Sequence, residues 1–93
     1  MIRHVVCQKF RDFADSQEAA RQLKALMGVV PSLKSMEVGV DEKRSERSYD
    51  VVLIATFDDW DGLKAYDTHP AHEKVRAFIK ARREATVSVD YTF

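Results

Sequence analysis

Residues 49–57 restrict the possible folds more than any other segment of this chain. Their apolar side chains alternate along an expected strand, with one face formed by Val51, Leu53, Ala55 and Phe57 and the other by Val52 and Ile54. A strand that is apolar on both faces is covered on both faces in a stable protein. Any fold for this chain must therefore supply one layer on each side of this strand.

Three more segments show the two-residue period of strands: residues 2–10, 36–40 and 85–93. One face of the first segment carries Ile2, His4, Val6, Gln8 and Phe10. In the last segment one face carries Thr86, Ser88 and Asp90, and the opposite face carries Val87, Val89, Tyr91 and Phe93. The sequence therefore predicts four strands.

Helical spacing of apolar residues predicts three helices between these strands. The first begins with a capping-box pattern at Asp15 and ends before Pro31. The second is capped by Asp58 or Asp59, and the third begins at Pro70. This order, β-α-β-β-α-α-β, favours a single α+β domain over residues 1–93, with a four-stranded antiparallel sheet and helices on one face.

Helices on one face leave the other face of such a sheet uncovered. Exposed apolar area costs about 25 cal/mol per Å², so a large apolar patch usually marks a subunit interface. A domain of 93 residues also has a marginal core of its own. We therefore predict a homodimer that packs through its helix-free sheet face, which carries Val5, Cys7, Val52, Ile54, Val87, Val89 and Tyr91.

Composition argues against several other partners. Lys plus Arg equals Asp plus Glu at 15 each, and this net charge of zero does not favour nucleic-acid binding. No apolar run is long enough to span a bilayer and no signal peptide is evident, so we predict a cytoplasmic protein without membrane contact. Cys7 is the only cysteine, and no metal-ligand spacing stands out, so neither a disulfide, a metal nor a cofactor is expected.

Four segments of the chain resemble those of one known family. They are Met1-Ile2-Arg3-His4-Val5-Val6, Tyr49-Asp50-Val51-Val52-Leu53, Ala65-Tyr66 with His69-Pro70-Ala71-His72, and Val89-Asp90-Tyr91. Together they resemble the stress-responsive dimeric α/β-barrel (Dabb) family over essentially the whole chain. The resemblance implies a ferredoxin-like subunit whose sheet pairs with a second sheet to form a dimeric α/β barrel. Functions in this family are diverse and include roles in stress response.

Two imidazoles and a phenol in the third segment suit proton transfer near neutral pH. Neutral His72 can accept an acidic proton between two carbonyls, while the Tyr66 hydroxyl donates to the oxygen that becomes negative. His4 can orient His72 or the substrate. These roles predict cofactor-independent enolisation, aldol cyclisation or isomerisation of a small carbonyl compound. The resemblance adds that a plant polyketide cyclase of the Dabb family has a catalytic pattern similar to these three residues.

The same side chains also have structural interpretations. His69 can cap the helix that follows it, and His72 can bond a backbone carbonyl. Tyr66 can be a core aromatic residue, and His4 can bond a neighbouring strand or Asp90. These interpretations favour a non-catalytic, stress-related dimer or a ligand-binding module. A second alternative is cofactor-free, monooxygenase-like oxidation.

A substrate pocket is expected between the helices and the sheet. The plant cyclase of the resembled family has aromatic residues where this chain has Ala19 and Ala20, and apolar residues where it has Thr86 and Ser88. These departures from the family pattern favour a small, polar carbonyl compound over a long alkyl chain. The basic stretch from Lys74 to Arg83 is interpreted as the solvated face of the last helix, and residues 41–48 as an exposed, mobile loop. The predicted substrate-binding residues are Ala20, Leu23, Leu53, Val75, Thr86 and Ser88.

Overall fold

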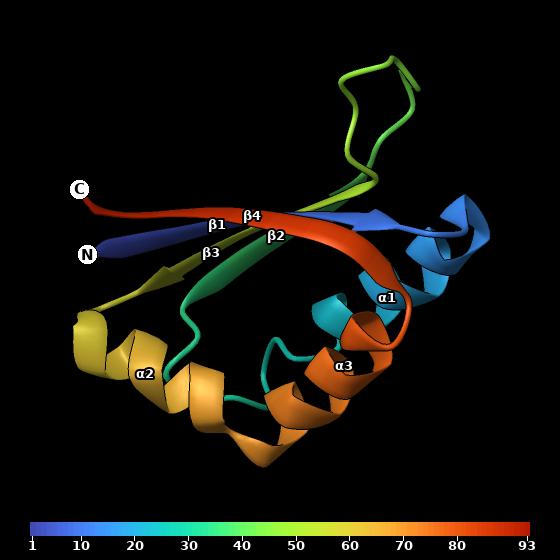
Figure 1. Cartoon of the computed structure of the whole chain (residues 1–93). Coiled ribbons are helices and arrows are strands. Elements are labelled where there is room, and N and C mark those ends of the chain that lie inside the picture. Colours follow the sequence, from blue (N-terminus) through green and yellow to red (C-terminus); the bar gives the residue numbers. More distant parts are fainter.

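A computed structural model describes all 93 residues of the chain. The chain forms four strands and three α-helices, with one short 3-10 helix between the first strand and the first α-helix. Figure 1 shows their arrangement. In chain order they are β1 (Ile2–Phe10), η1 (Phe13–Asp15), α1 (Ser16–Lys24), β2 (Ser35–Val40), β3 (Val51–Phe57), α2 (Trp60–Thr68), α3 (Pro70–Lys80) and β4 (Arg83–Thr92).

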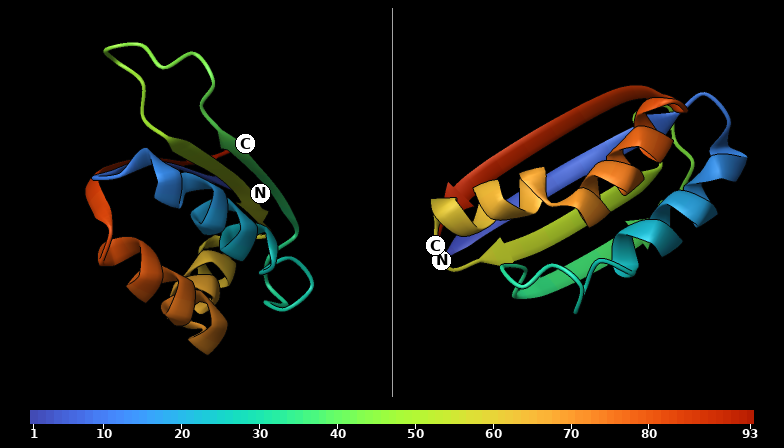
Figure 2. Two further views of the ribbon diagram at one scale, coloured as in Figure 1. Left: turned by 90° about the vertical axis from the view of Figure 1, so that its right-hand side faces the viewer. Right: turned by 90° about the horizontal axis from the view of Figure 1, so that it is seen from below.

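The strands form one antiparallel sheet in the order β2-β3-β1-β4, so β2 and β4 are its edges. All three α-helices lie on the same face of this sheet, as the view from below in Figure 2 shows. This is the ferredoxin-like α+β architecture predicted from the sequence, and the prediction is confirmed. The longest helix, α3, has 11 residues, and no helix has the length and hydropathy that crossing a bilayer requires.

The core lies between the helices and the sheet. Along β3, the residues on the helix side are at most 5% exposed, whereas Val52 and Ile54 on the opposite face are only half-buried. The helix-free face continues onto β4, where Val87 and Val89 are 52% and 63% exposed. The two-sided apolar character predicted for the sheet is therefore present, and one side of it has no cover within the chain.

The first helix is shorter than its apolar spacing predicted. It ends at Lys24, and residues 25–32 form turns in which Gly28 adopts φ of +87°. A backbone in this left-handed region cannot continue an α-helix, so the prediction of a helix up to Pro31 is wrong. The predicted capping box is also wrong: Asp15 makes no capping bond, and the Ala14 N–H instead donates to Asp12.

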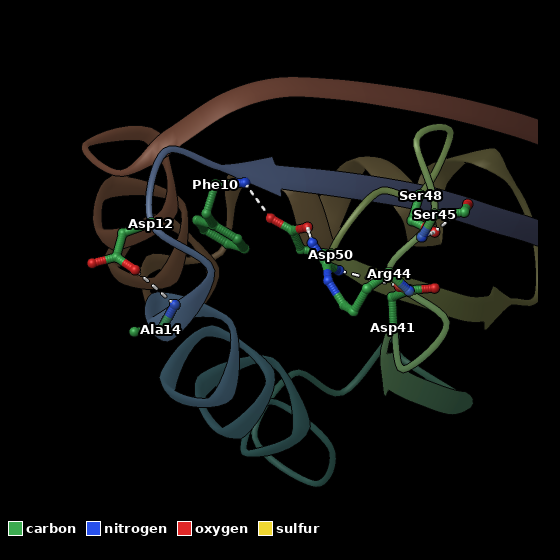
Figure 3. Close-up of polar contacts among 8 residues, drawn as sticks. All are labelled: Phe10, Asp12, Ala14, Asp41, Arg44, Ser45, Ser48 and Asp50. Carbon is green, nitrogen blue, oxygen red and sulfur yellow. Dashed lines mark hydrogen bonds and ion pairs between the residues drawn. The ribbon is translucent and has the colours of Figure 1, made fainter.

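A buried carboxylate, Asp50, joins the start of β3 to the end of β1 (Figure 3). It is 2% exposed, and its oxygens accept bonds of 2.8 Å from the Phe10 N–H and from the Arg44 guanidinium. Arg44 also bonds Asp41 and lies over the Phe13 ring at 3.8 Å. These contacts anchor the loop between β2 and β3, which projects on the helix-free side of the sheet in Figure 1.

Candidate functional site

A cavity of about 200 Å³ lies between the helix layer and the sheet. Its apolar wall consists of Val6, Leu23, Leu53, Val75 and Ile79. Its polar wall consists of His4, Gln8, Asp67, His72, Arg76, Arg83, Thr86 and Ser88. A small hollow with one apolar and one polar wall suits a compact, polar organic molecule.

His4 enters the cavity from β1. Its partner in the β1–β4 register is Asp90, and the two side chains meet through His4 Nδ1 and Asp90 Oδ1. Because a carboxylate only accepts hydrogen bonds, we assign the proton of this pair to Nδ1. The Nε2 atom of His4 is therefore the one available to a ligand. The His4 side chain is 14% exposed, which is consistent with a group at a cavity wall.

His72 lies in the first turn of α3, and its Nδ1 is 3.1 Å from the Asp67 carbonyl oxygen at the end of α2. Donation of the Nδ1 proton to this oxygen leaves the Nε2 lone pair free. Burial lowers the pKa of His72 below its ordinary value of 6.5, and the nearby positive charge of Arg76 lowers it further. His72 is therefore a neutral imidazole at neutral pH, as general-base chemistry requires.

Tyr66, in the last turns of α2, packs directly behind the histidines. Its ring lies 4.2 Å from that of His72, 6.2 Å from that of His4 and 5.2 Å from that of Phe57, measured between centroids. The residue is completely buried and its hydroxyl has no hydrogen-bond partner within the chain. Burial raises the pKa of Tyr66 above its ordinary value of 10.0, so the hydroxyl remains protonated. Tyr66 does not border the cavity.

His69 has the structural role that the sequence suggested. It is the residue between α2 and α3, and its Nδ1 accepts a 3.1 Å bond from the Ala71 N–H. This bond satisfies one of the free N–H groups at the start of α3, and Pro70 occupies the first helical position. The capping interpretation of His69 is confirmed.

The structure brings together most of the residues predicted for the site. His4, Tyr66 and His72 converge, and the cavity is bordered by Leu23, Leu53, Val75, Thr86 and Ser88. Ala20 does not belong to this set, because it is 3% exposed within the packed interior and does not line the cavity.

Arg76 and Arg83 are cavity residues that the sequence interpretation missed. The sequence interpretation assigned both residues to the solvated face of the last helix. In the structure both line the polar wall of the cavity, and Arg83 belongs to β4. That interpretation is therefore wrong for Arg83, whereas Arg76 is an exposed residue of α3 that also borders the cavity. The four-residue spacing from His72 to Arg76 places both on one helix face, and this signal was available in the sequence. No group of three or more His, Cys, Asp or Glu side chains is placed to share a metal ion.

The fold and the cavity define a ferredoxin-like subunit with a histidine-lined pocket under its helices. The stress responsive A/B barrel domain (Dabb) family matches residues 2–93, and the chain belongs to this family.

Three known proteins are similar to this chain over nearly its whole length. Olivetolic acid cyclase of Cannabis sativa is 26% identical over 98% of this chain and 95% of its own length. An uncharacterized protein of Streptomyces coelicolor is 34% identical over 100% of both chains. The structure of a dimeric protein of unknown function from Bacteroides fragilis, with a ferredoxin-like fold, has a TM-score of 0.88 at 25% identity, covering 99% of this chain and 95% of its own.

Proposed function

We propose that this protein binds a small carbonyl compound in the cavity and catalyses its enolisation without a cofactor, as the first step of an aldol cyclisation or an isomerisation. The observation that carries this proposal is the pair of imidazoles at the cavity wall. His72 is neutral with a free Nε2, and His4, held by Asp90 through its Nδ1, presents its own Nε2 to the cavity. Similarity to olivetolic acid cyclase supports the same class of chemistry.

In the proposed step, a C–H bond next to the carbonyl breaks and its proton moves to Nε2 of His72. The electron pair of that bond forms the enolate, whose oxygen gains negative charge. His4, fixed by Asp90, orients the substrate for this transfer. The Tyr66 hydroxyl is the donor to the enolate oxygen in the proposal. It lies behind the cavity wall, so its use requires a side-chain rearrangement when the substrate binds.

Proton exchange at carbon tests this step directly. With ethyl acetoacetate in deuterium oxide, NMR is expected to show loss of the signal of the protons between the two carbonyls faster than in buffer alone. His72→Gln is expected to lower this enzymatic rate by about 100-fold, since general-base catalysis contributes about that factor or more. His69→Asn is the matched control: it removes an imidazole three positions away but keeps a residue that caps helices well.

Two results would support the non-catalytic alternative instead. One is exchange no faster than in buffer alone, and the other is an unchanged rate in a folded His72→Gln variant. In that case the protein is a ligand-binding module or a stress-related dimer whose histidines are structural. The monooxygenase-like alternative stays a prediction that no group in the cavity specifically favours.

The quaternary structure is part of the proposal. We propose a homodimer formed through the helix-free sheet face, because Val87, Val89, Tyr91 and Phe93 are 40–63% exposed there, a patch typical of an interface. The dimeric relative from Bacteroides fragilis supports this assembly.

Two valine variants test the proposed face. Val89→Lys is expected to yield monomer or aggregate in light scattering. Val29→Lys, which charges a valine that is 53% exposed in the turns after α1, is expected to leave the dimer intact. An intact dimer in both variants would argue against this face.

A further inference from the structure

The pairing of β4 with β1 turns one arginine towards the cavity. Lys9 pairs with Ala85, but the next residue, Phe10, pairs with Arg83, so Glu84 is an extra residue that has no partner. Residues directly opposite each other in a sheet share a face, and Phe10 is 4% exposed in the core under the helices. Arg83 is therefore on the helix-covered face. Without this bulge, Glu84 would take that place, with the opposite charge.

A second arginine lies on the same polar wall. The Arg76 guanidinium is 2.9 Å from the Asp67 carbonyl oxygen and 3.4 Å from Nδ1 of His72. The contact with Asp67 holds the guanidinium beside the proposed base. Arg76 thus comes from α3 in the helix layer and Arg83 from β4 in the sheet, and both line the cavity.

Neither arginine is neutralised by a contact within the chain. No carboxylate lies within 4.0 Å of the nitrogens of Arg76 or Arg83, whereas six other close pairs of opposite charge occur in the protein. Two carboxylates are near the cavity. Asp90 is already in contact with His4, and Asp67 lines the cavity without pairing with either guanidinium. The two guanidinium groups therefore remain available to bind a ligand.

We propose that the cavity holds its substrate by an anionic group, and that the substrate is a small carbonyl compound with a carboxylate near the carbon that loses its proton. This inference rests on the proposed function and adds the substrate class to it. A guanidinium binds a carboxylate through two parallel N–H bonds, which gives orientation as well as affinity. Enolisation of such an anion creates a second negative charge, and the two arginines stabilise it.

A matched pair of probes tests the proposal. Acetoacetate and its neutral ethyl ester share the same acidic carbon and differ in the anionic group. Titration of each into the full-length protein, followed by the NMR signals of the His72 ring, is expected to show about tenfold tighter binding of acetoacetate. Added salt is expected to weaken only the binding of acetoacetate.

Two variants then assign the preference to an arginine. Arg83→Gln is expected to remove most of the tenfold preference for acetoacetate over the ester. Its backbone carbonyl, which accepts a bond from Arg11, is retained. Lys74→Gln removes one positive charge from an exposed position of α3 and is expected to keep the preference. If Arg83→Gln fails to fold, Arg83→Lys is the second variant. It keeps the positive charge but cannot donate two parallel N–H bonds to a carboxylate, so a smaller preference for acetoacetate over the ester is expected.

The outcomes separate this inference from the proposed function. Equal binding of acid and ester, binding of neither, or an undiminished preference in a folded Arg83 variant would overturn the anionic subsite. If the ester still exchanges its protons in a His72-dependent way, the proposed catalysis stands without that subsite. A carboxylate preference that depends on Arg83 without any proton exchange would leave the subsite established and refute the catalysis.

Discussion

The buried hydroxyl of Tyr66 allows stability and activity to be separated in one substitution. Tyr66→Phe removes a polar atom that has no partner within the chain and keeps the ring that packs against Phe57 and His72. An unsatisfied buried hydroxyl costs about 1–3 kcal/mol in proteins. We therefore expect the free energy of unfolding to rise by about 1–2 kcal/mol. For a domain of this size, each kcal/mol raises Tm by about 4–8 °C.

Thermal and urea unfolding at one fixed protein concentration measure this change, since the stability of a dimer depends on concentration. If Tyr66 is a donor to the enolate, the more stable variant is also expected to lose about 100-fold in the rate of proton exchange. A loss of stability of 1 kcal/mol or more would refute the reasoning. It would mean that the hydroxyl is hydrogen-bonded in solution, for example to a buried water molecule.

Three further predictions concern the loop anchor, a turn and the pH dependence. Arg44→Ala is expected to lower the free energy of unfolding by about 3–5 kcal/mol, because it leaves the Asp50 carboxylate, which is 2% exposed, without its counter-charge. Asp50→Ala removes that buried charge and is expected to cost about 1–3 kcal/mol, because it leaves the Phe10 N–H unpaired. Equal costs in urea unfolding would contradict this. Gly28→Ala is expected to cost about 1–2 kcal/mol in the same assay, since φ of +87° strains any residue with a Cβ; a neutral result would contradict it. Because the pKa of His72 is lowered in the folded protein, the unfolded chain takes up a proton on this residue at a higher pH than the folded protein does. The contribution of neutral His72 to the free energy of unfolding is therefore complete above pH 6.5 and is lost as the pH falls below it. His72→Gln is expected to flatten this pH dependence, and an unchanged slope would count against a buried neutral His72.

Side-chain alternation allowed most of the fold to be predicted from the sequence. The alternating residues of β3 point in the expected directions because the pleat of a strand imposes the same period of two. The end of α1 was not predictable in the same way. Leu26 and Val30 continue the helical spacing and are buried, but they lie in turns, so burial alone does not distinguish the two structures. Gly28 was the local signal for the helix end.

The candidate site was predictable only in part. The convergence of His4, Tyr66 and His72 follows from the order of elements together with the family resemblance. The side to which Arg83 points depends on a bulge between β1 and β4, which is a property of strand pairing and leaves no clear local pattern. The separation of Tyr66 from the cavity depends on how the side chains pack, and no residue spacing encodes it.

The edge position of β4 has a consequence for the newly made chain. This strand has ten residues, pairs with β1 along one side only, and exposes Val87 and Val89. A long apolar edge is a template for uncontrolled β-pairing between molecules. If the proposed dimer covers this surface, a subunit released from it is vulnerable to aggregation. The yield of soluble protein is therefore expected to fall when subunits cannot pair, either at low protein concentration or when the chain is produced together with a variant that does not form the dimer.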